Sequence, residues 1–360
     1  MTTLVTGGTG FLGRALVQQL VERGESNVRV LTRHFDLELS DLGVEIVEGS
    51  LDSPEDVRRV VDGVSKVYHC AGLVERDASK AHKMYAVHVD GTRRLLDALR
   101  DQKVERIVVA STSGCVGVSD DPEFIATDSS PYVEQYARKW PYYLSKIAQE
   151  KVCNRFIEDH GMPIVQMRPT LLLGPGDTRE SSTGDVSLFL QKKVPVKLSG
   201  GLSFVDVRDA ATAFILAMET PEAKGTYLLG AANWTLGDFF DQLEALSGVK
   251  APKVSLPKEA TLQGTRLLST ALKMFGVRSD LDPVSVEMAS LFWYIDSSKA
   301  QRELGWEPRE PMLTLRDTVR WLQSYHPSLA TSGPAEPVGH PSDWVPQETI
   351  EWAHAQRENR

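Results

Sequence analysis

The first 170 residues alternate between short β-branched runs and longer segments with helical periodicity. Strand-like runs occur at 3–7, 27–32, 44–49, 66–71, 106–111 and 163–168. Helical patterns follow most of them, at 11–23, 54–62, 82–102 and 141–160. Strands that alternate with helices predict βαβ units and a parallel, doubly wound α/β sheet. The runs are apolar along nearly their whole length, as expected for strands covered by helices on both faces.

The pattern changes after residue 170. Residues 171–185 are rich in Gly, Pro and Ser and read as a loop, whereas 201–207 and 225–230 read as returning strands. Residues 327–346 contain five prolines and predict an extended arm, with a short helix at 347–358. We therefore predict a nucleotide-binding domain, a smaller and mostly C-terminal substrate-binding region and a Pro-rich arm, at 1–170 plus about 203–232, about 171–202 plus 233–326, and 327–360.

Composition excludes several classes of partner. The 360 residues are 41% hydrophobic, which is ample for a globular core. The net charge of −9 and the lack of basic runs argue against nucleic acid, whose phosphates supply most of the affinity for proteins. No apolar run reaches membrane-spanning length, so we expect no integral membrane segment.

The N-terminus and the cysteines bear on location. Residues 1–6, MTTLVT, lead directly into a strand-like run and do not resemble a secretory leader. The three cysteines are widely spaced, which argues against a disulfide framework and against a zinc site. We expect a cytoplasmic, reduced protein without a metal site.

The first βα turn carries a phosphate-loop signature. Residues 6–13 read TGGTGFLG, with Gly7, Gly10 and Gly13 between the first predicted strand and the first predicted helix. In this context Gly7 allows the tight turn, Gly10 lets the backbone approach a pyrophosphate, and Gly13 lets the helix pack on the sheet. The helix N-terminus then presents N–H groups and partial positive charge to the phosphates. The spacing predicts a Rossmann dinucleotide site, against the alternative of a tight turn without a ligand.

The end of the second strand bears on the choice of dinucleotide. An NAD site usually has Asp or Glu there to bind the ribose 2′-hydroxyl, but this chain has Arg33. A guanidinium suits a 2′-phosphate better than a hydroxyl. We expect NADP(H) to be preferred, with NAD(H) possible; the alternative is that Arg33 is a solvated loop residue.

Tyr142 and Lys146 are four residues apart in the segment WPYYLSK. This spacing places them on one face of a helix, and none of the other eight tyrosines has a lysine at this spacing. Two interpretations follow from the pair alone. It is either a solvated pair beside a core tyrosine, or a proton donor next to the charge that tunes its pKa.

Together these motifs resemble the extended short-chain dehydrogenase/reductases, the NAD-dependent epimerase/dehydratase superfamily. The resemblance rests on TGGTGFLG, ASTSG at 110–114, PYYLSK at 141–146 and DSSKAQRELGWEPR at 296–309, and it covers about residues 1–325. The segments GPGDTRESSTGD and GGLSFVDVRDAA resemble those of the dihydroflavonol-reductase-like subgroup.

The resemblance implies a catalytic set. Tyr142 would donate or accept the substrate proton, and Lys146 would bind the nicotinamide ribose and lower the pKa of the tyrosine. A Ser/Thr hydroxyl would bind the substrate oxygen; Ser113 matches the family position, and Thr112 competes because the register can slip by one residue.

The resemblance also implies cofactor contacts. In the family, the residue at Leu51 packs on the adenine ring, and the one at Asp52 reaches its amino group. The turn after the sixth strand, Arg168 to Thr170, faces the nicotinamide amide. This chain departs from the family at His88, where Asn is usual. The implied cofactor contacts, beyond the three loop glycines, are Thr9, Phe11, Leu12, Arg33, Leu51, Asp52, Ala71, Gly72, Tyr142, Lys146, Pro169 and Thr170.

The predicted function is NADPH-dependent reduction of a ketone or aldehyde on a small, largely apolar or aromatic substrate. Arg33 and the subgroup resemblance support it, and an amphipathic pattern at 260–277 could cover an apolar pocket, although ordinary core packing explains that pattern too. One alternative is a nucleotide-sugar epimerase or dehydratase with tightly bound NAD, its diphosphate served by Lys192, Lys193, Lys197 and Arg208. Another is a non-catalytic dinucleotide-binding protein. The resemblance implies a homodimer formed through the helices near 82–102 and 141–160.

Overall fold

The computed structural model describes residues 2–75, 78–194, 196–253 and 283–329. The amphipathic segment at 260–277, the helix at 347–358 and the arm beyond residue 329 lie outside the described residues.

The larger sheet has seven parallel strands, in the order β3-β2-β1-β4-β5-β6-β9. Its order reverses between β1 and β4, which is the position where doubly wound sheets bind their ligands. The predicted α/β class is confirmed, and each predicted N-terminal strand is present. The strands are β1 (Thr2–Thr6), β2 (Val28–Thr32), β3 (Glu45–Glu48), β4 (Val64–His69), β5 (Arg106–Ala110), β6 (Ile164–Pro169) and β9 (Gly225–Leu229).

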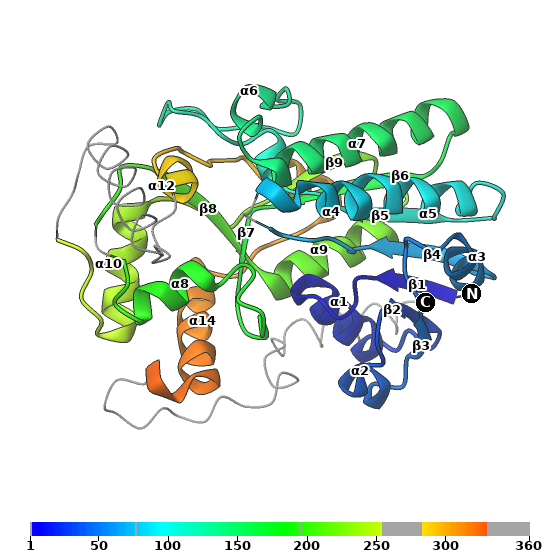
Figure 1. Cartoon of the computed structure of the whole chain (residues 1–360), viewed down its shortest axis with the longest axis horizontal. Helices are drawn as coiled ribbons and strands as arrows, with labels where there is room; N and C mark the ends of the chain where they lie inside the picture. Colours follow the sequence, from blue (N-terminus) through cyan, green and yellow to red (C-terminus); the bar gives the residue numbers. More distant parts are fainter. Residues whose placement is uncertain (1, 76–77, 195, 254–282, 330–360) are drawn as a thin grey trace.

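Helices cover both faces of this sheet (Figure 1). One face carries α1 (Phe11–Glu22) and α9 (Val207–Glu219), with α2 (Leu37–Asp41) and α13 (Ser298–Leu304) nearby. The other face carries α3 (Pro54–Val61), α5 (Thr92–Leu99) and α7 (Pro141–His160).

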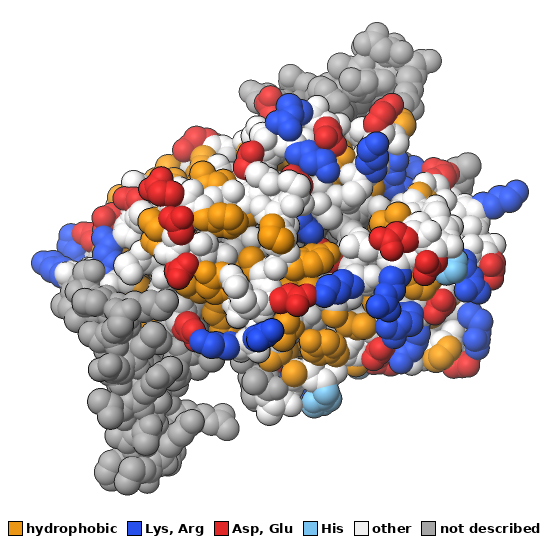
Figure 2. Space-filling model, turned by 90° about the horizontal axis from the view of Figure 1, so that it is seen from above, with side chains coloured by type: hydrophobic (Ala, Val, Ile, Leu, Met, Phe, Trp, Pro, Cys, Tyr) orange, Lys and Arg blue, Asp and Glu red, His pale blue; other side chains and the backbone are white. Residues whose placement is uncertain are grey.

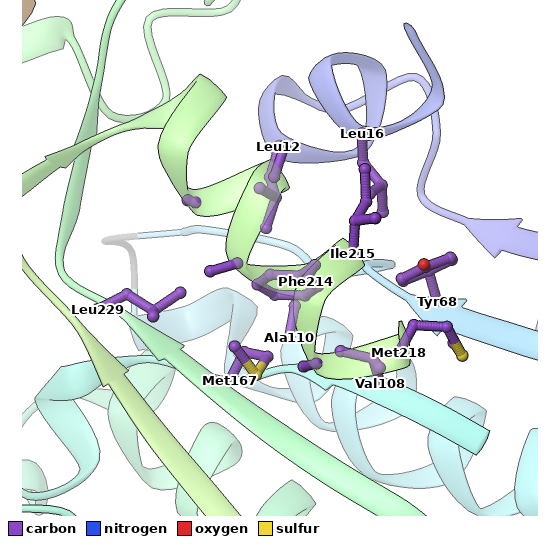
Figure 3. Packing of buried hydrophobic residues seen from close by; sticks show 14 of the residues in the cluster. Leu12, Leu16, Tyr68, Val108, Ala110, Met167, Phe214, Ile215, Met218 and Leu229 are labelled. Atoms are coloured by element: carbon purple, nitrogen blue, oxygen red, sulfur yellow. The ribbon is translucent and has the colours of Figure 1, made fainter. Parts of the chain in front are cut away.

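A buried apolar layer joins the first pair of helices to the strands. Leu12 and Leu16 of α1 point toward α9 (Figure 3). Phe214 of α9 lies over Met167 of β6 in the same buried cluster. This packing holds the N-terminus of α1 against the carboxyl edge of the sheet, where the phosphate loop lies.

The helix expected at 82–102 is interrupted by a π-helical segment. It consists of α4 (Ala81–Tyr85), the π-helix η2 (Ala86–Gly91) and α5. The sequence pattern did not predict the interruption, since a π-turn adds one residue to the hydrogen-bonded ring without breaking the apolar face.

A second, smaller sheet has three strands. Its order is β10-β8-β7, with β10 (Ala232–Thr235), β8 (Gly201–Asp206) and β7 (Leu171–Leu173). Thus β8 lies in the smaller sheet, whereas α9 and β9, which follow it, belong with the larger sheet. The helices α8 (Gly184–Leu190), α10 (Leu236–Ser247) and α14 (Pro311–Tyr325) pack against the smaller sheet around a shared apolar cluster.

Short elements complete the described chain: η1 (Ala78–Lys80), η3 (Ser113–Cys115), α6 (Glu134–Ala137), α12 (Pro283–Met288) and η4 (Pro327–Leu329). Acidic and basic side chains are interspersed on the face shown in Figure 2. Within the described ranges, no helix has the length and apolar character needed to cross a bilayer.

Candidate active site

The phosphate loop is folded as a narrow backbone cradle. Gly7 has φ +76° and lies so close to the turn after β4 that an added Cβ would be 2.5 Å from the Ala71 nitrogen. A Cβ at Gly13 would lie 2.2 Å from the Gly7 carbonyl oxygen, and one at Gly10 3.2 Å from the same atom. Gly10 caps α1 without a side-chain hydrogen bond. Backbone without side chains at a helix N-terminus can approach the pyrophosphate of a dinucleotide closely, so this loop fits such a ligand.

The other predicted residues of the loop and of the β4 turn lie at the same edge of the sheet. Thr9 and Phe11 are half-buried, and Leu12 is buried in the core beneath α1. The Ala71 backbone nitrogen donates to the Thr6 hydroxyl at 3.3 Å, and Gly72 is exposed. The structure therefore brings the β1 and β4 turns together, as the doubly wound topology requires.

The predicted adenosine side contains several arginines. Arg33 is exposed just beyond β2. The carboxylates that follow it are already paired: Arg14 binds Asp36 at 2.6 Å and Glu38 at 2.7 Å. Asp36 also accepts from the Leu39 nitrogen as the cap of α2. These bonds hold the pKa of Asp36 below its usual value, although its partial burial acts in the opposite direction.

Four of the predicted cofactor residues have partners within the protein. Leu51 is buried, with its side chain against Gly91. Asp52 is exposed and forms an ion pair with Arg94 at 3.5 Å. Pro169 and Thr170 are buried at the end of β6, and the Thr170 hydroxyl donates to the Leu229 carbonyl oxygen at 3.0 Å. Their roles toward a cofactor stay predictions.

Tyr142 lies in the first turn of α7, which Pro141 begins. Its side chain is half-buried. The Thr112 side chain, next to the predicted Ser113, lies near enough to act on the pKa of that phenol, and its hydroxyl accepts from the Gly114 backbone nitrogen at 3.3 Å. Ser113 is buried at the start of η3. Ser113 and Thr112 therefore both stay candidates for the hydroxyl that binds the substrate oxygen.

Burial has the largest effect on the pKa of Tyr142 and raises it above its usual value, while the nearby Thr112 side chain acts in the lowering direction. The phenol is therefore held in its protonated form. The role of Lys146 toward the phenol stays a prediction.

Lys146 is buried on the next turn of α7. Its Nζ donates to the Ala110 carbonyl oxygen at 2.8 Å and to the Gln149 amide oxygen at 2.9 Å. Burial lowers the pKa of Lys146 to about 8, and nearby thiols and Glu150 act in the raising direction. The ammonium is near its titration point at neutral to mildly basic pH.

A buried chain of hydrogen bonds extends from Lys146 toward the phosphate loop. The Gln149 amide nitrogen donates to the Thr92 hydroxyl at 2.9 Å. Thr92 is 2.8 Å from Nε2 of His69, whose Nδ1 is 2.7 Å from the Thr6 hydroxyl. Burial, helped by the charge of Lys146, lowers the pKa of His69 to about 3, so this link is neutral. Sequence reasoning missed both Gln149 and Thr92, although Gln149 follows Lys146 by three residues on α7, a spacing that places two side chains on one helix face.

Behind the site, Arg168 and Glu150 form a buried ion pair. Two parallel bonds join them, Nε to Oε1 at 2.9 Å and Nη2 to Oε2 at 2.6 Å. The Ser111 hydroxyl donates to the same carboxylate. The guanidinium of Arg168 is therefore directed at α7, and Glu150, one turn after Lys146, is a partner that the sequence pattern did not reveal.

Aromatic side chains lie beside Tyr142. The Tyr143 ring is 5.1 Å from that of Tyr142 and 5.2 Å from that of Trp293, and Trp293 is 5.6 Å from Trp140. Trp140 also lines a cleft of about 370 Å³ whose walls carry charged side chains, including Lys139 and Glu287. Tyr142 thus has an aromatic neighbour in Tyr143, and the charged cleft lies beyond Trp140 without Tyr142 in its lining.

Comparisons with known proteins agree with this geometry. The family model described as "NAD dependent epimerase/dehydratase family" matches residues 3–230. Sterol demethylase protein B of Methylococcus capsulatus is 30% identical over 329 residues, covering 90% of this chain and 98% of that protein. Cinnamoyl-CoA reductase 1 of Arabidopsis thaliana is 28% identical over 261 residues, covering 68% of this chain and 74% of that protein.

A solved structure extends the match to the whole fold. The crystal structure of gox2253 superposes with a TM-score of 0.78 at 28% identity, covering 90% of this chain and 98% of that one. The phosphate cradle, the Tyr142–Lys146 pair on α7 and the seven-stranded sheet are thus found in a chain that matches the family along most of its length. The chain belongs to the NAD dependent epimerase/dehydratase family and is an NAD(P)-dependent oxidoreductase of the extended short-chain dehydrogenase/reductase type.

Proposed function

We propose that the chain reduces a ketone or aldehyde on a small, largely apolar or aromatic substrate, with NADPH as the donor. The observation that carries the proposal is the Tyr142 phenol, which lies at the start of α7 near Thr112, one helical turn before the buried Lys146, with burial raising its pKa. A protonated phenol beside a second hydroxyl is suited to receive a carbonyl oxygen and give it a proton.

The roles of the residues follow from this arrangement. The nicotinamide, when bound, supplies the hydride that adds to the carbonyl carbon. Tyr142 and Thr112 donate hydrogen bonds to the carbonyl oxygen, and each donor onto developing negative charge lowers the barrier by about 3 kcal/mol. Tyr142 then transfers its proton to that oxygen. Lys146, fixed by the Ala110 carbonyl and the Gln149 amide, holds positive charge beside the site while it is protonated.

The preference for NADP rests on Arg33 and its neighbours. Asp36 and Glu38, the carboxylates closest along the chain after β2, are bound to Arg14. They are thus engaged and poorly placed to accept from a ribose 2′-hydroxyl. Arg33 is exposed at the strand end, where a guanidinium binds a 2′-phosphate.

The substrate class is inferred from the aromatic wall and from the relatives. The Tyr143 ring lies next to Tyr142 and packs in turn on Trp140 and Trp293, so the surroundings of Tyr142 on this side are apolar and aromatic. The names of the two relatives above indicate a sterol and a cinnamoyl thioester, whose carbon skeletons are apolar.

Two of the basic residues considered for a sugar diphosphate are engaged: Arg208 with Asp206 at 2.7 Å, and Lys197 with Asp241 at 3.0 Å. These ion pairs make the nucleotide-sugar alternative the weaker one. The homodimer stays a prediction.

The test is carbonyl-dependent oxidation of NADPH. The purified chain is incubated with NADPH and a panel that includes benzaldehyde, cinnamaldehyde and a 3-oxosteroid, and the loss of reduced-nicotinamide absorbance is followed. Tyr142→Phe, which removes the proton donor and keeps the ring, should lose most of the turnover while still binding NADPH. Wild-type turnover in the Phe variant, or NADPH oxidation that does not depend on any carbonyl compound, contradicts the proposal.

A further inference from the structure

His88 occupies the π-helical segment η2, on the side that faces α7. It is completely buried. Its ring packs edge-on against the Tyr142 ring, with centroids 5.8 Å apart and planes at 75°. π-helical turns are rare and are frequently found at functional sites. The interruption of this helix therefore coincides with the residue that contacts the candidate proton donor.

The two ring nitrogens of His88 have different partners. Nε2 is 3.0 Å from the backbone nitrogen of Leu73, which can only donate. Nε2 must therefore be the unprotonated nitrogen, and the hydrogen of the neutral ring is on Nδ1. Nδ1 is 2.8 Å from the Ser145 hydroxyl, and that hydroxyl donates to the Tyr142 carbonyl oxygen at 2.7 Å. The bonds have one direction, from His88 through Ser145 to the backbone of Tyr142.

Burial favours the neutral form of the ring. Burial lowers the pKa of His88 well below its usual value, and Lys146 and His69, the charged and titratable groups that face it, act in the same direction. A protonated ring would also lose the Leu73 bond, since Nε2 would then be a donor facing a donor. His88 is thus not a proton carrier in this site.

His88 connects two parts of the site that lie far apart along the sequence. Through Leu73 it holds the turn after β4, where Gly72 passes so close that an added Cβ would be 3.2 Å from Nε2. Through Ser145 and through its ring face it holds the first turn of α7 and the Tyr142 ring. Because a misplacement of about 1 Å at a reacting group can cost about 100-fold in rate, this connection bears directly on turnover.

We propose that His88 is a positioning residue for Tyr142: its neutral imidazole fixes the phenol relative to the turn after β4. The proposal rests on the function proposed for Tyr142. His88 has two hydrogen-bonded connections: the first arm joins it to Leu73 and the second arm joins it to Ser145. Amide side chains of different length can test the two arms separately. In His88→Asn the amide lies at the depth of Nδ1, so the variant keeps a donor for Ser145 and loses the acceptor for Leu73. In His88→Gln the amide lies at the depth of Nε2, so the variant keeps the acceptor and loses the donor.

The experiment compares His88→Asn, His88→Gln and Ser145→Ala with the wild-type chain. Thermal melting shows that each variant is folded, and NADPH fluorescence gives its cofactor affinity. Turnover is measured with the panel compound that the wild type reduces fastest, in water and in deuterium oxide. Hydrogen exchange at the Leu73 amide reports the first arm without any substrate.

The expected result is a loss in kcat with cofactor affinity retained. Each variant should lose about 10-fold to 100-fold in kcat, keep NADPH affinity within about twofold and show a larger solvent isotope effect, because proton transfer becomes slower. Leu73 exchange should accelerate in His88→Asn and not in His88→Gln. His88→Gln and Ser145→Ala remove the same arm, so their effects on kcat should not add in the double variant.

Two other outcomes are distinguishable. If the folded His88 variants keep wild-type kcat and isotope effect while Tyr142→Phe is inactive, the positioning role is wrong and the proposed function stands. If Tyr142→Phe keeps wild-type activity, the proposed function is wrong, and the positioning role that rests on it is overturned as well. A loss of activity that only tracks a loss of folded protein assigns His88 a structural role and overturns the proposal.

Discussion

The Nζ atom of Lys146 lies 2.9 Å from the amide oxygen of Gln149, and this contact sets the orientation of that amide. An ammonium only donates, so Gln149 must present its oxygen to Lys146 and its nitrogen to Thr92. The side-chain partner that the structure gives this buried ammonium is therefore neutral. Burial accordingly dominates and lowers the pKa of Lys146 to about 8.

A carboxylate in place of this amide should restore the charge of Lys146. Below a pKa of about 8 the wild-type lysine is protonated, and it loses its proton as pH rises through that value. If the ammonium is the active form, kcat/KM for NADPH should fall above about pH 8. Gln149→Glu should move the falling limb upward by about one pH unit or more, since an adjacent opposite charge stabilises the ammonium. Gln149→Met, neutral and of similar length, is the control. If kcat/KM falls at the same pH in the Glu and Met variants, the fall does not report the charge of Lys146.

The hydroxyl beside Tyr142 can be identified by a matched pair of substitutions. Thr112→Ala removes the hydroxyl of the residue that acts on the pKa of Tyr142, and it should lower kcat by about 100-fold to 1,000-fold, the usual effect of losing one donor to developing charge. Ser113→Ala removes the hydroxyl at the position that the family resemblance indicates. We expect a much smaller effect there, measured in the same assay. The reverse ranking would return the role to Ser113.

The buried pair of Arg168 and Glu150 should be important for stability. Glu150→Gln leaves the guanidinium buried without its counter-charge, which typically costs about 3–5 kcal/mol in the free energy of unfolding. The adjacent Lys151 pairs with Glu134 on the surface, where both side chains are about half exposed. Lys151→Met should therefore change stability by no more than about 1 kcal/mol. Denaturant titration of the two variants measures both; equal losses would show that burial of the pair does not matter.

The cofactor preference depends on one exposed arginine. Arg33→Asp should weaken NADPH binding much more than NADH binding, because the new carboxylate repels a 2′-phosphate and can accept from a 2′-hydroxyl. Fluorescence titration with each cofactor measures the ratio of affinities. Arg58→Asp, on the exposed face of α3, controls for the change in net charge. Equal losses for both cofactors with Arg33→Asp would remove the basis for an NADP preference.

The fold could be predicted from the sequence because its signals are local. The β-branched runs, the glycine spacing in TGGTGFLG and the i,i+4 spacing of Tyr142 and Lys146 each depend on a few neighbouring residues. The smaller sheet was harder to predict. Its strand β7 has three residues, and β8 pairs with it across a long stretch of chain.

The hydrogen bonds of the site could not be read from spacing. His88 and Ser145, or Gln149 and Thr92, are 57 residues apart in each case, and only the packing of α7 on η2 and α5 brings them together. The surroundings that act on the pKa of Tyr142 could not be read from spacing either. Spacing suggested that Lys146 would act on the phenol, but the lysine is held by Ala110 and Gln149, and burial decides the direction. The one-residue choice between Ser113 and Thr112 likewise depended on the path of the chain after β5.

The most direct test of the central claim is the fate of an isotope label. NADPH deuterated at its transferable position is incubated with the purified chain and the preferred carbonyl compound, and the product is analysed by mass spectrometry. The account predicts an alcohol that carries one deuterium, formed by wild type and abolished in Tyr142→Phe. A chain that leaves the label in the nicotinamide and every carbonyl compound unreduced, yet epimerises a UDP-sugar with cofactor retained from purification, would contradict it.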